Sequence, residues 1–169
     1  MSIQETLEQY GITSLYHFTD RSNLKSIKKY GLQSLENIAQ NNISVSRFGA
    51  NRLSHSLDRV MGLDKFVHLS FIKDHPMYHV AKYRGSIVDP VWLEIDISVL
   101  FKKKTLICDT LANGYNANIF DVNRISDFIN LDAMVYSREF NIRKEARKAE
   151  ILVSNKIKID KIIGVHSGK

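Results

Sequence analysis

The chain has 169 residues, of which 44% are hydrophobic and 25% charged, a composition typical of a folded protein and not of a disordered one. This length fits a single domain, residues 1–169, that can bury a core without covalent cross-links. The lone cysteine, Cys108, excludes an internal disulfide and a cysteine-cluster zinc site, while a net charge of +6 favours a polyanionic partner such as nucleic acid.

The longest apolar runs are much shorter than a membrane span. The first residues lack the basic and then apolar pattern of a secretion signal. We therefore expect a cytoplasmic protein without membrane association.

The N-terminal forty residues predict two helices that flank a strand. Residues 2–10 predict a short helix ended by Gly11, and the β-rich residues 15–19 predict a strand. A second helix is expected over 24–30, because apolar residues recur three apart and a glycine follows. The polar, asparagine-rich segment 36–48 predicts a loop.

The middle of the chain alternates between helical and extended patterns. Residues 51–60 predict a helix, and residues 66–71 alternate as a strand does, with His68 on the face of Phe66 and Ser70. A helix over 76–84 starts with a proline, which suits a first helical turn. Residues 91–97 form the clearest strand pattern in the chain.

The following segment has weaker signals. We expect a short strand over 105–108, a long loop over 109–123 and a helical turn over 125–131. Residues 133–136 predict a short extended piece, and the polar residues 137–145 predict a mobile segment.

A basic run, residues 143–148, leads directly into Glu150 and a predicted strand over 150–153. We expect this carboxylate at a sheet edge beside several cations, where it can stabilise a developing positive charge. The alternative is a surface glutamate paired with Arg147 or Lys148.

A final strand is expected over 157–165, after a turn at Asn155. The chain contains no internal repeat, low-complexity tract or linker rich in glycine, serine and proline. A single domain of the α+β class is therefore the simplest interpretation.

Several common types of site are excluded or disfavoured. His75 and His79 have the spacing of paired zinc ligands but lack the intervening glutamate, and His75 precedes a proline, so we expect no metal site. The chain lacks the phosphate-binding loop, the dinucleotide-binding glycine motif and the Gly-x-Ser-x-Gly motif of serine hydrolases.

A dispersed set of polar residues could bind a ligand. His17 and Thr19 share one face of a predicted strand, and Asn23 follows near a helix start, which suits hydrogen bonds to a carboxamide and to ribose hydroxyls. The alternative is that His17 is a core histidine whose hydrogen bonds are satisfied internally. Arg52 or Arg59 could bind a pyrophosphate, although either could be a surface charge.

Met77 and Tyr78 could form a wall of a pocket for an aromatic ligand, or they could belong to the core at helical spacing. Candidates for stacking on nucleic-acid bases are Tyr115, Phe120, Phe128 and Tyr136, and such aromatics serve equally often as loop anchors.

Taken together, three motifs resemble those of the DarT family of DNA ADP-ribosyltransferase toxins. The run Tyr16-His17-Phe18-Thr19, with Asn23 and Gly31-Leu32 after it, resembles the opening motif. His75-Pro76-Met77-Tyr78 resembles the second motif, and Arg147 to Val153 resembles the third, which contains the catalytic glutamate. The resemblance spans about residues 14 to 165.

The resemblance implies an ADP-ribosyltransferase fold, a split pair of small sheets with the co-substrate NAD in the cleft between them. His17 and Thr19 would hold the nicotinamide-ribose end with Asn23 nearby, Met77 would line the pocket, and Glu150 would be catalytic. The family also uses an arginine between its first and second motifs. Arg52 fits that place best, and Arg59 is the rival.

The resemblance also implies a substrate and a partner. Family members modify bases in single-stranded DNA, generally thymidine, and are paired with a macrodomain antitoxin. Residues 113–147 would correspond to the loop that recognises the substrate. The chain departs from the pattern in having Phe18 where isoleucine is common, which leaves base preference open.

Two alternatives of different classes remain at this point. One is an RNA-directed transferase of the same fold, similar to an RNA 2′-phosphotransferase. The other is a basic nucleic-acid-binding module in which Glu150 is only structural.

Overall fold

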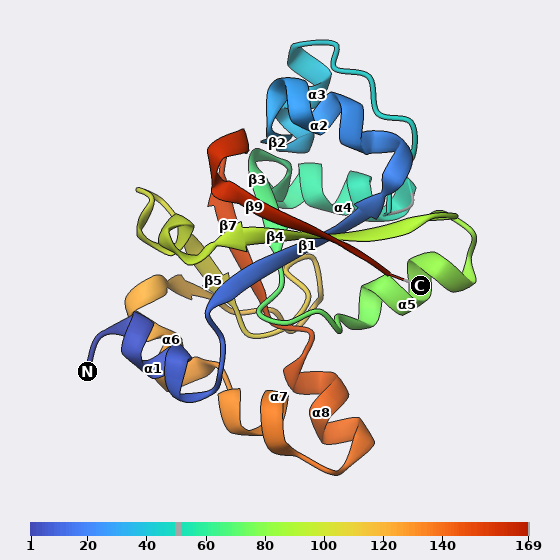
Figure 1. Cartoon of the computed structure of the whole chain (residues 1–169). Coiled ribbons are helices and arrows are strands. Elements are labelled where there is room, and N and C mark those ends of the chain that lie inside the picture. The colour runs from blue at the N-terminus through green and yellow to red at the C-terminus, as the bar shows by residue number, and fades with distance from the viewer. Residues whose placement is uncertain (50–51, 169) are drawn as a thin grey trace.

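The computed structural model describes residues 1–49 and 52–168, without the side chains of residues 52–54. Its strands form two main antiparallel sheets and one small sheet (Figure 1). The first main sheet has the order β1-β4-β9, with β1 at Ser14–Asp20, β4 at Pro90–Asp96 and β9 at Ile162–Ser167. No helix in the described ranges is both long and apolar enough to cross a membrane.

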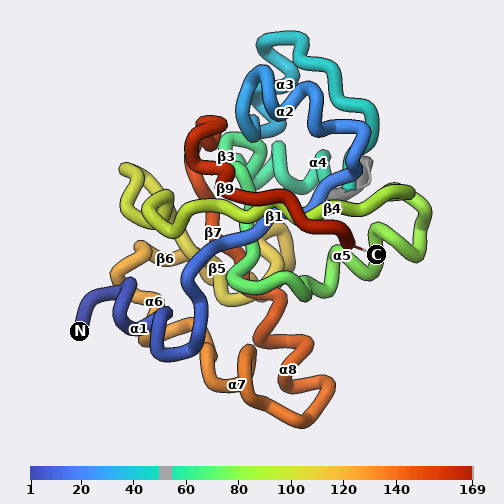
Figure 2. The backbone as a smooth tube through the Cα atoms, viewed as in Figure 1, coloured from blue at the N-terminus to red at the C-terminus, as the bar shows by residue number. Residues whose placement is uncertain are grey.

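The second main sheet has the order β3-β7-β5-β6. Its strands are β3 (Phe66–Leu69), β7 (Glu150–Ser154), β5 (Leu106–Cys108) and β6 (Ile119–Asp121). Figure 2 shows β6 beside β5, at the side of the molecule away from β3. A small two-stranded sheet pairs β2 (Leu32–Gln33) with β8 (Lys156–Ile157).

In the described residues, one backbone bridge joins the two main sheets. It is an isolated antiparallel bridge between Tyr16 of β1 and Ser70, just after β3. Beyond this bridge β1 pairs with β4 and β3 pairs with β7, so the two sheets separate. This is the split arrangement that the resemblance implies.

The core lies between these sheets and forms because side chains alternate along each strand. Ile151 and Val153 of β7 are fully buried together with Leu93 and Ile95 of β4. Each such side chain contributes about 1.5–3 kcal/mol relative to an exposed position. The opposite face of β7 carries Glu150 and Leu152, so the same alternation that builds the core turns Glu150 away from it.

The helices gather at the two ends of this arrangement (Figure 1). At one end lie α2 (Leu24–Tyr30), α3 (Leu35–Gln40) and α4 (Arg52–Met61), and α5 (Pro76–Tyr83) follows β3 in the chain. At the other end α1 (Ile3–Gln9) contacts α6 (Ile125–Phe128), and α7 (Leu131–Tyr136) contacts α8 (Phe140–Ala146).

The predicted strands at 15–19, 66–71, 91–97, 105–108 and 150–153 are confirmed, with small shifts at their ends. The helices predicted in the first hundred residues are also confirmed, and Gly11, Gly31 and Gly85 have positive φ angles just after helices. A left-handed residue at this place ends a helix, and glycine adopts it without steric cost.

Two predictions in the segment before Glu150 are wrong. Residues 133–136 are not extended but belong to α7, which begins where Asn130 accepts a hydrogen bond from the amide of Ala133 at 2.9 Å. The helix forms because Leu131 and Met134 bury one face of this short segment. The segment 137–145, predicted to be mobile, contains most of α8, which lies against α7 and carries no buried residue.

Three other predictions are wrong in part. The expected loop over 36–48 begins inside α3, which Ser34 caps, and the expected loop over 109–123 contains β6. The predicted strand over 157–165 is divided, because a 3₁₀ turn at Ile159–Lys161 separates β8 from β9.

Candidate functional site

Glu150 opens strand β7, which lies between β3 and β5 and therefore inside the sheet. The expectation of a sheet-edge position is wrong. The backbone of Glu150 pairs with Cys108 of β5, and β3 joins the other side of β7 from the next residue, Ile151, so the start of the strand is fixed within the sheet. The side chain is 13% exposed, which excludes an ordinary surface glutamate.

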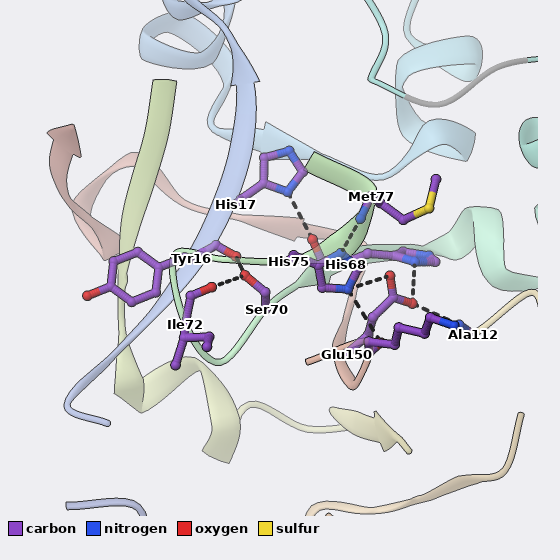
Figure 3. Close-up of polar contacts among 10 residues, drawn as sticks. Tyr16, His17, His68, Ser70, Ile72, His75, Met77, Ala112 and Glu150 are labelled. Atoms are coloured by element: carbon purple, nitrogen blue, oxygen red, sulfur yellow. Dashed lines mark hydrogen bonds and ion pairs between the residues drawn. The ribbon is translucent and has the colours of Figure 1, made fainter. Parts of the chain in front are cut away.

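The Glu150 carboxylate contacts three groups from different parts of the chain (Figure 3). The backbone N–H of Ala112 donates to Oε2 at 2.9 Å. The Nδ1 atom of His68 lies 3.5 Å from the same oxygen, and Nε2 of His75 lies 3.8 Å from Oε1. Each oxygen atom of the carboxylate thus faces at least one nitrogen atom.

The basic run before Glu150 does not surround the carboxylate. Arg147 forms an ion pair with Asp74 and donates a hydrogen bond to the carbonyl of Met134 at 3.0 Å. Lys148 pairs with Glu145 at 2.7 Å. The expected placement of the basic run beside Glu150 is therefore wrong, and so is the alternative pairing with Arg147 or Lys148, because histidines provide the partners instead.

The charge state of the site follows from these contacts. Burial raises the pKa of Glu150, but the proximity of His68 and His75 and the Ala112 N–H outweigh it, so the pKa lies below its ordinary value. Burial lowers the pKa of His68, but the neighbouring Glu150 and Asp58 outweigh this and raise it to about 9. At neutral pH the pair is a carboxylate beside an imidazolium.

His17 faces the opening between the two sheets from β1. Its Nδ1 atom donates to the backbone carbonyl of His68 at 2.9 Å, since a carbonyl can only accept. Burial lowers the pKa of His17, so the ring is neutral. A neutral ring with its proton on Nδ1 offers Nε2 as an acceptor for a donor on a ligand.

Asn23 is held entirely by the chain itself. Its amide nitrogen donates to Thr19 Oγ1 at 3.0 Å and to the Arg47 carbonyl at 2.6 Å. Its amide oxygen accepts from the backbone N–H groups of Ser46 and Arg47, at 2.9 and 3.2 Å. All four hydrogen-bonding positions of this buried amide are thus used to fix the loop at residues 46–47 against β1.

A pocket of about 260 Å³ lies in the opening between the sheets. Five residues predicted for the site line this pocket: His17, Thr19, Asn23, Met77 and Glu150. His68, His75 and Arg47 line it too, and the sequence did not single out these three for the site. The pattern of residues 66–71 placed His68 on one strand face but gave no reason to connect that face with Glu150.

The three arginines between the first two motifs differ in position. Arg59 is exposed and is not among the residues that line the pocket. Arg47 lines the pocket from the loop that Asn23 fixes, and its Nη1 donates to the Gly85 carbonyl at 3.4 Å. Arg52 begins α4, and its side chain lies outside the described part of the structure.

The remaining candidates fall into two groups. Tyr115 is fully exposed, whereas Phe120 and Phe128 stack on each other with ring centroids 3.6 Å apart. Tyr136 packs near Tyr10, with 5.9 Å between ring centroids.

Among the described residues no group of three or more histidine, cysteine, aspartate or glutamate side chains could hold a metal ion. His75 and His79, which have the spacing of paired zinc ligands, contact different carboxylates, those of Glu150 and Asp74.

Comparisons with known proteins are consistent across most of the chain. A family model described as "ssDNA thymidine ADP-ribosyltransferase, DarT" matches residues 16–168. Among solved structures, Thermosipho africanus DarTG in complex with ADP-ribose is similar with a TM-score of 0.74 and 22% identity, covering 90% of this chain and 43% of that chain. This chain thus spans less than half the length of that relative.

Two structures from Thermus sp. 2.9 are also similar. DarT in complex with ADP-ribosylated ssDNA gives a TM-score of 0.70 at 17% identity, covering 92% of this chain and 81% of that chain. DarT in complex with NAD+ gives 0.65 at 19% identity, covering 91% and 81%. A search of curated proteins finds no match. The structural similarities confirm the predicted α+β fold of the ADP-ribosyltransferase type.

Proposed function

Because the chain belongs to the DarT family of single-stranded-DNA thymidine ADP-ribosyltransferases, we propose that it transfers ADP-ribose from NAD to a thymidine base in single-stranded DNA. We also propose that the activity resides in one domain over the whole chain. The observation that carries the proposal is that the Glu150 carboxylate and the His17 ring line the same pocket.

The nicotinamide-ribose end of NAD would bind between His17 and Glu150. The Nε2 atom of His17 can accept a hydrogen bond from the carboxamide N–H₂ group, since its Nδ1 proton already bonds the chain. Thr19 would contact the ribose, and Met77 would pack on the nicotinamide ring, as a flexible thioether side chain can. Asn23 would act indirectly, by fixing Thr19 and the loop that carries Arg47.

A cation is needed for the pyrophosphate. We propose Arg47 for this role, because it lines the pocket and its guanidinium retains N–H donors beyond the one bound to Gly85. Arg52 remains the second candidate for the arginine that the family uses, for NAD contact or for catalysis. Arg47 and Arg59 are both exposed, but Arg59 does not line the pocket, which favours a solvated surface charge for Arg59.

The reaction would begin with cleavage of the bond between the ribose C1′ and the nicotinamide nitrogen. Nicotinamide leaves with the bonding electrons, and positive charge develops on the ribose in an oxocarbenium-like transition state. The Glu150 carboxylate stabilises this charge in a pocket largely screened from solvent. A nitrogen of the base then forms a bond to C1′, and its proton is transferred to Glu150.

Single-stranded DNA is the polymer that suits this pocket. A base can enter an enclosed site only after it leaves the stack, and unstacking costs least in a single strand. The net charge of +6 favours a phosphate backbone, and the exposed ring of Tyr115 lies on the loop whose Ala112 N–H binds Glu150. Similarity to Thermus DarT bound to ADP-ribosylated ssDNA supports the same choice.

A macrodomain antitoxin is the proposed protein partner, with this chain as the toxin. The resemblance in the sequence motifs and the similarity to the longer Thermosipho DarTG chain support it. Its expected effect is removal of ADP-ribose from DNA that this chain has modified. We also propose a location in the cytoplasm, since the proposed reaction uses NAD and DNA as its substrates.

The direct test is incubation of the protein with NAD and one of three matched oligonucleotides: single-stranded DNA with one thymidine, the same DNA without thymidine, and the equivalent RNA. Mass spectrometry should show one added ADP-ribose on the first only. Modification of the RNA instead would favour the RNA-directed alternative. Binding of DNA without modification of any oligonucleotide would favour the non-enzymatic alternative.

A further inference from the structure

The partners of Glu150 hold its two oxygen atoms unequally. Oε2 accepts the Ala112 N–H at 2.9 Å and also faces Nδ1 of His68 at 3.5 Å. Oε1 faces Nε2 of His75 at the longer distance of 3.8 Å. One oxygen is thus fixed by two groups, while the other is only loosely contacted.

The protons on His68 follow from what its two ring nitrogens face. Nε2 lies 3.1 Å from the backbone carbonyl of Leu63, which can only accept, so Nε2 carries a proton. Nδ1 faces the carboxylate of Glu150, which when ionised also can only accept. A favourable contact on both sides therefore needs a proton on each nitrogen, and the ring is an imidazolium.

His75 has a different arrangement. Its Nδ1 accepts the backbone N–H of Met77 at 3.2 Å, because His75 caps the first turn of α5. The ring is therefore neutral with its proton on Nε2, directed towards the Lys148 carbonyl at 3.4 Å and Glu150 Oε1. Burial lowers the pKa of His75, in agreement with the neutral form.

Resting on the proposed function, we infer that His68 is a positioning residue for the transfer reaction. As an imidazolium clamped between Leu63 and Glu150, it fixes Oε2 and leaves Oε1 to face the ribose. Strand β3 thereby orients the carboxylate that β7 delivers, and the two strands are neighbours in the sheet, with His68 and Leu152 in register. A carboxylate that rotated freely would spend less time in the orientation that the transition state needs.

The charged and titratable groups around His68 come from four elements. Glu150 faces it from β7 and the buried Asp58 from α4, and both carboxyl groups favour the charged ring. Two further histidines lie nearby, His75 at the start of α5 and His17 on β1. Both are neutral and disfavour the charged form of His68 only weakly. Together these groups raise the pKa of His68 to about 9. Above that pH the Nδ1 lone pair would face Oε2, and the clamp would become repulsive.

Two substitutions separate the two hydrogen-bonding ends of the ring. His68→Asn places an amide N–H₂ near the position of Nδ1, so a donor towards Glu150 is retained without charge. His68→Gln places its amide near Nε2, so the contact with Leu63 is retained and the donor to Glu150 is lost. His79→Asn serves as the control, because His79 is exposed and contacts Asp74.

The measurement is the rate of transfer to a thymidine-containing oligonucleotide across pH 7 to 10, with kcat and the KM for NAD determined separately. His68→Gln should lower kcat about 100-fold, with the KM for NAD changed by less than about 3-fold, since a loss of orientation mainly affects the transition state. His68→Asn should lower kcat by about 10-fold or less and should lack the wild-type loss of activity near pH 9. The control should behave as the wild type.

A second measurement does not depend on activity. The Cε1–H proton of His68, followed by NMR in the full chain, should titrate near pH 9 and should move towards the ordinary histidine range in Glu150→Gln. Titration below pH 7 in the wild type would overturn the inference. So would a correctly folded His68→Gln variant with an unchanged kcat. A wild-type protein that modifies no oligonucleotide would overturn the proposed function first, and the role of His68 with it.

Discussion

Tyr16 and Ser70 exchange two backbone hydrogen bonds, of 2.9 and 2.8 Å, and this single bridge joins the two main sheets. One residue further along β1, the side chain of His17 donates a hydrogen bond across the opening to the carbonyl of His68. This bond fixes the distance between β1 and β3 where the two sheets begin to separate. The pocket lies where they separate. Its geometry therefore depends on this backbone bridge and on the hydrogen bond of His17.

Substitution Asn23→Ala should destabilise both the fold and the pocket. The alanine removes the acceptor of the Ser46 and Arg47 amide groups, two partly buried hydrogen bonds whose loss costs about 1–3 kcal/mol in total. The free energy of unfolding in urea should fall by that amount, and the KM for NAD should rise because Arg47 is released. Asn41→Ala, which removes an exposed hydrogen bond to Asn37, is the control and should change neither value.

Arg47 and Arg59 provide a matched pair for the pyrophosphate contact. Arg47→Gln should weaken NAD binding about 10-fold or more, as expected for the loss of a charge-assisted contact of about 1.5–3 kcal/mol. Arg59→Gln should leave NAD binding unchanged, because Arg59 does not line the pocket. Isothermal titration calorimetry of both variants with NAD checks this prediction. Weaker NAD binding by Arg59→Gln than by Arg47→Gln would contradict it.

Asp20 should make the stability of the protein dependent on acidic pH. Burial raises the pKa of this carboxyl, but hydrogen bonds from Ser22, Val88 and Asp89 outweigh it and hold the pKa far below its ordinary value. The resulting stabilisation is fully present above the unfolded pKa of about 4 and is lost as the pH falls towards the folded value. Asp20→Asn should therefore lose less unfolding free energy between pH 7 and pH 3 than the wild type does in urea titrations.

The strands that position the site could be predicted because their patterns are local. In β4, apolar and acidic residues alternate from Leu93 to Asp96, and in β7 the short apolar run Ile151-Leu152-Val153 is buried on both faces, and each pattern is typical of a strand. The helices α7 and α8 could not be predicted, because each is short and is stabilised by packing against its neighbours. Strand β6 has exposed residues at both ends and exists because β5 pairs with it.

The residues of the site also fall into those that the sequence could predict and those that it could not. Motifs predicted His17, Thr19, Asn23, Met77 and Glu150, and the fold brings all five to one pocket. The partners of Glu150 could not be predicted, since His68 and His75 lie more than seventy residues away in the chain and meet it only through strand pairing and the start of α5. Arg47 could not be chosen over Arg59 either, because the position of its loop depends on hydrogen bonds to distant residues, above all those of Asn23.

The most direct measurement is transfer by Glu150→Gln, which keeps the size of the side chain and removes its charge. With NAD and a thymidine-containing single strand, the variant should lose on the order of 10³-fold or more in kcat, because the carboxylate stabilises charge that exists only in the transition state. Its NAD affinity should change little, and Glu145→Gln, whose partner is Lys148, should remain fully active. Wild-type rates of transfer by Glu150→Gln would contradict the assignment of Glu150 as the catalytic residue.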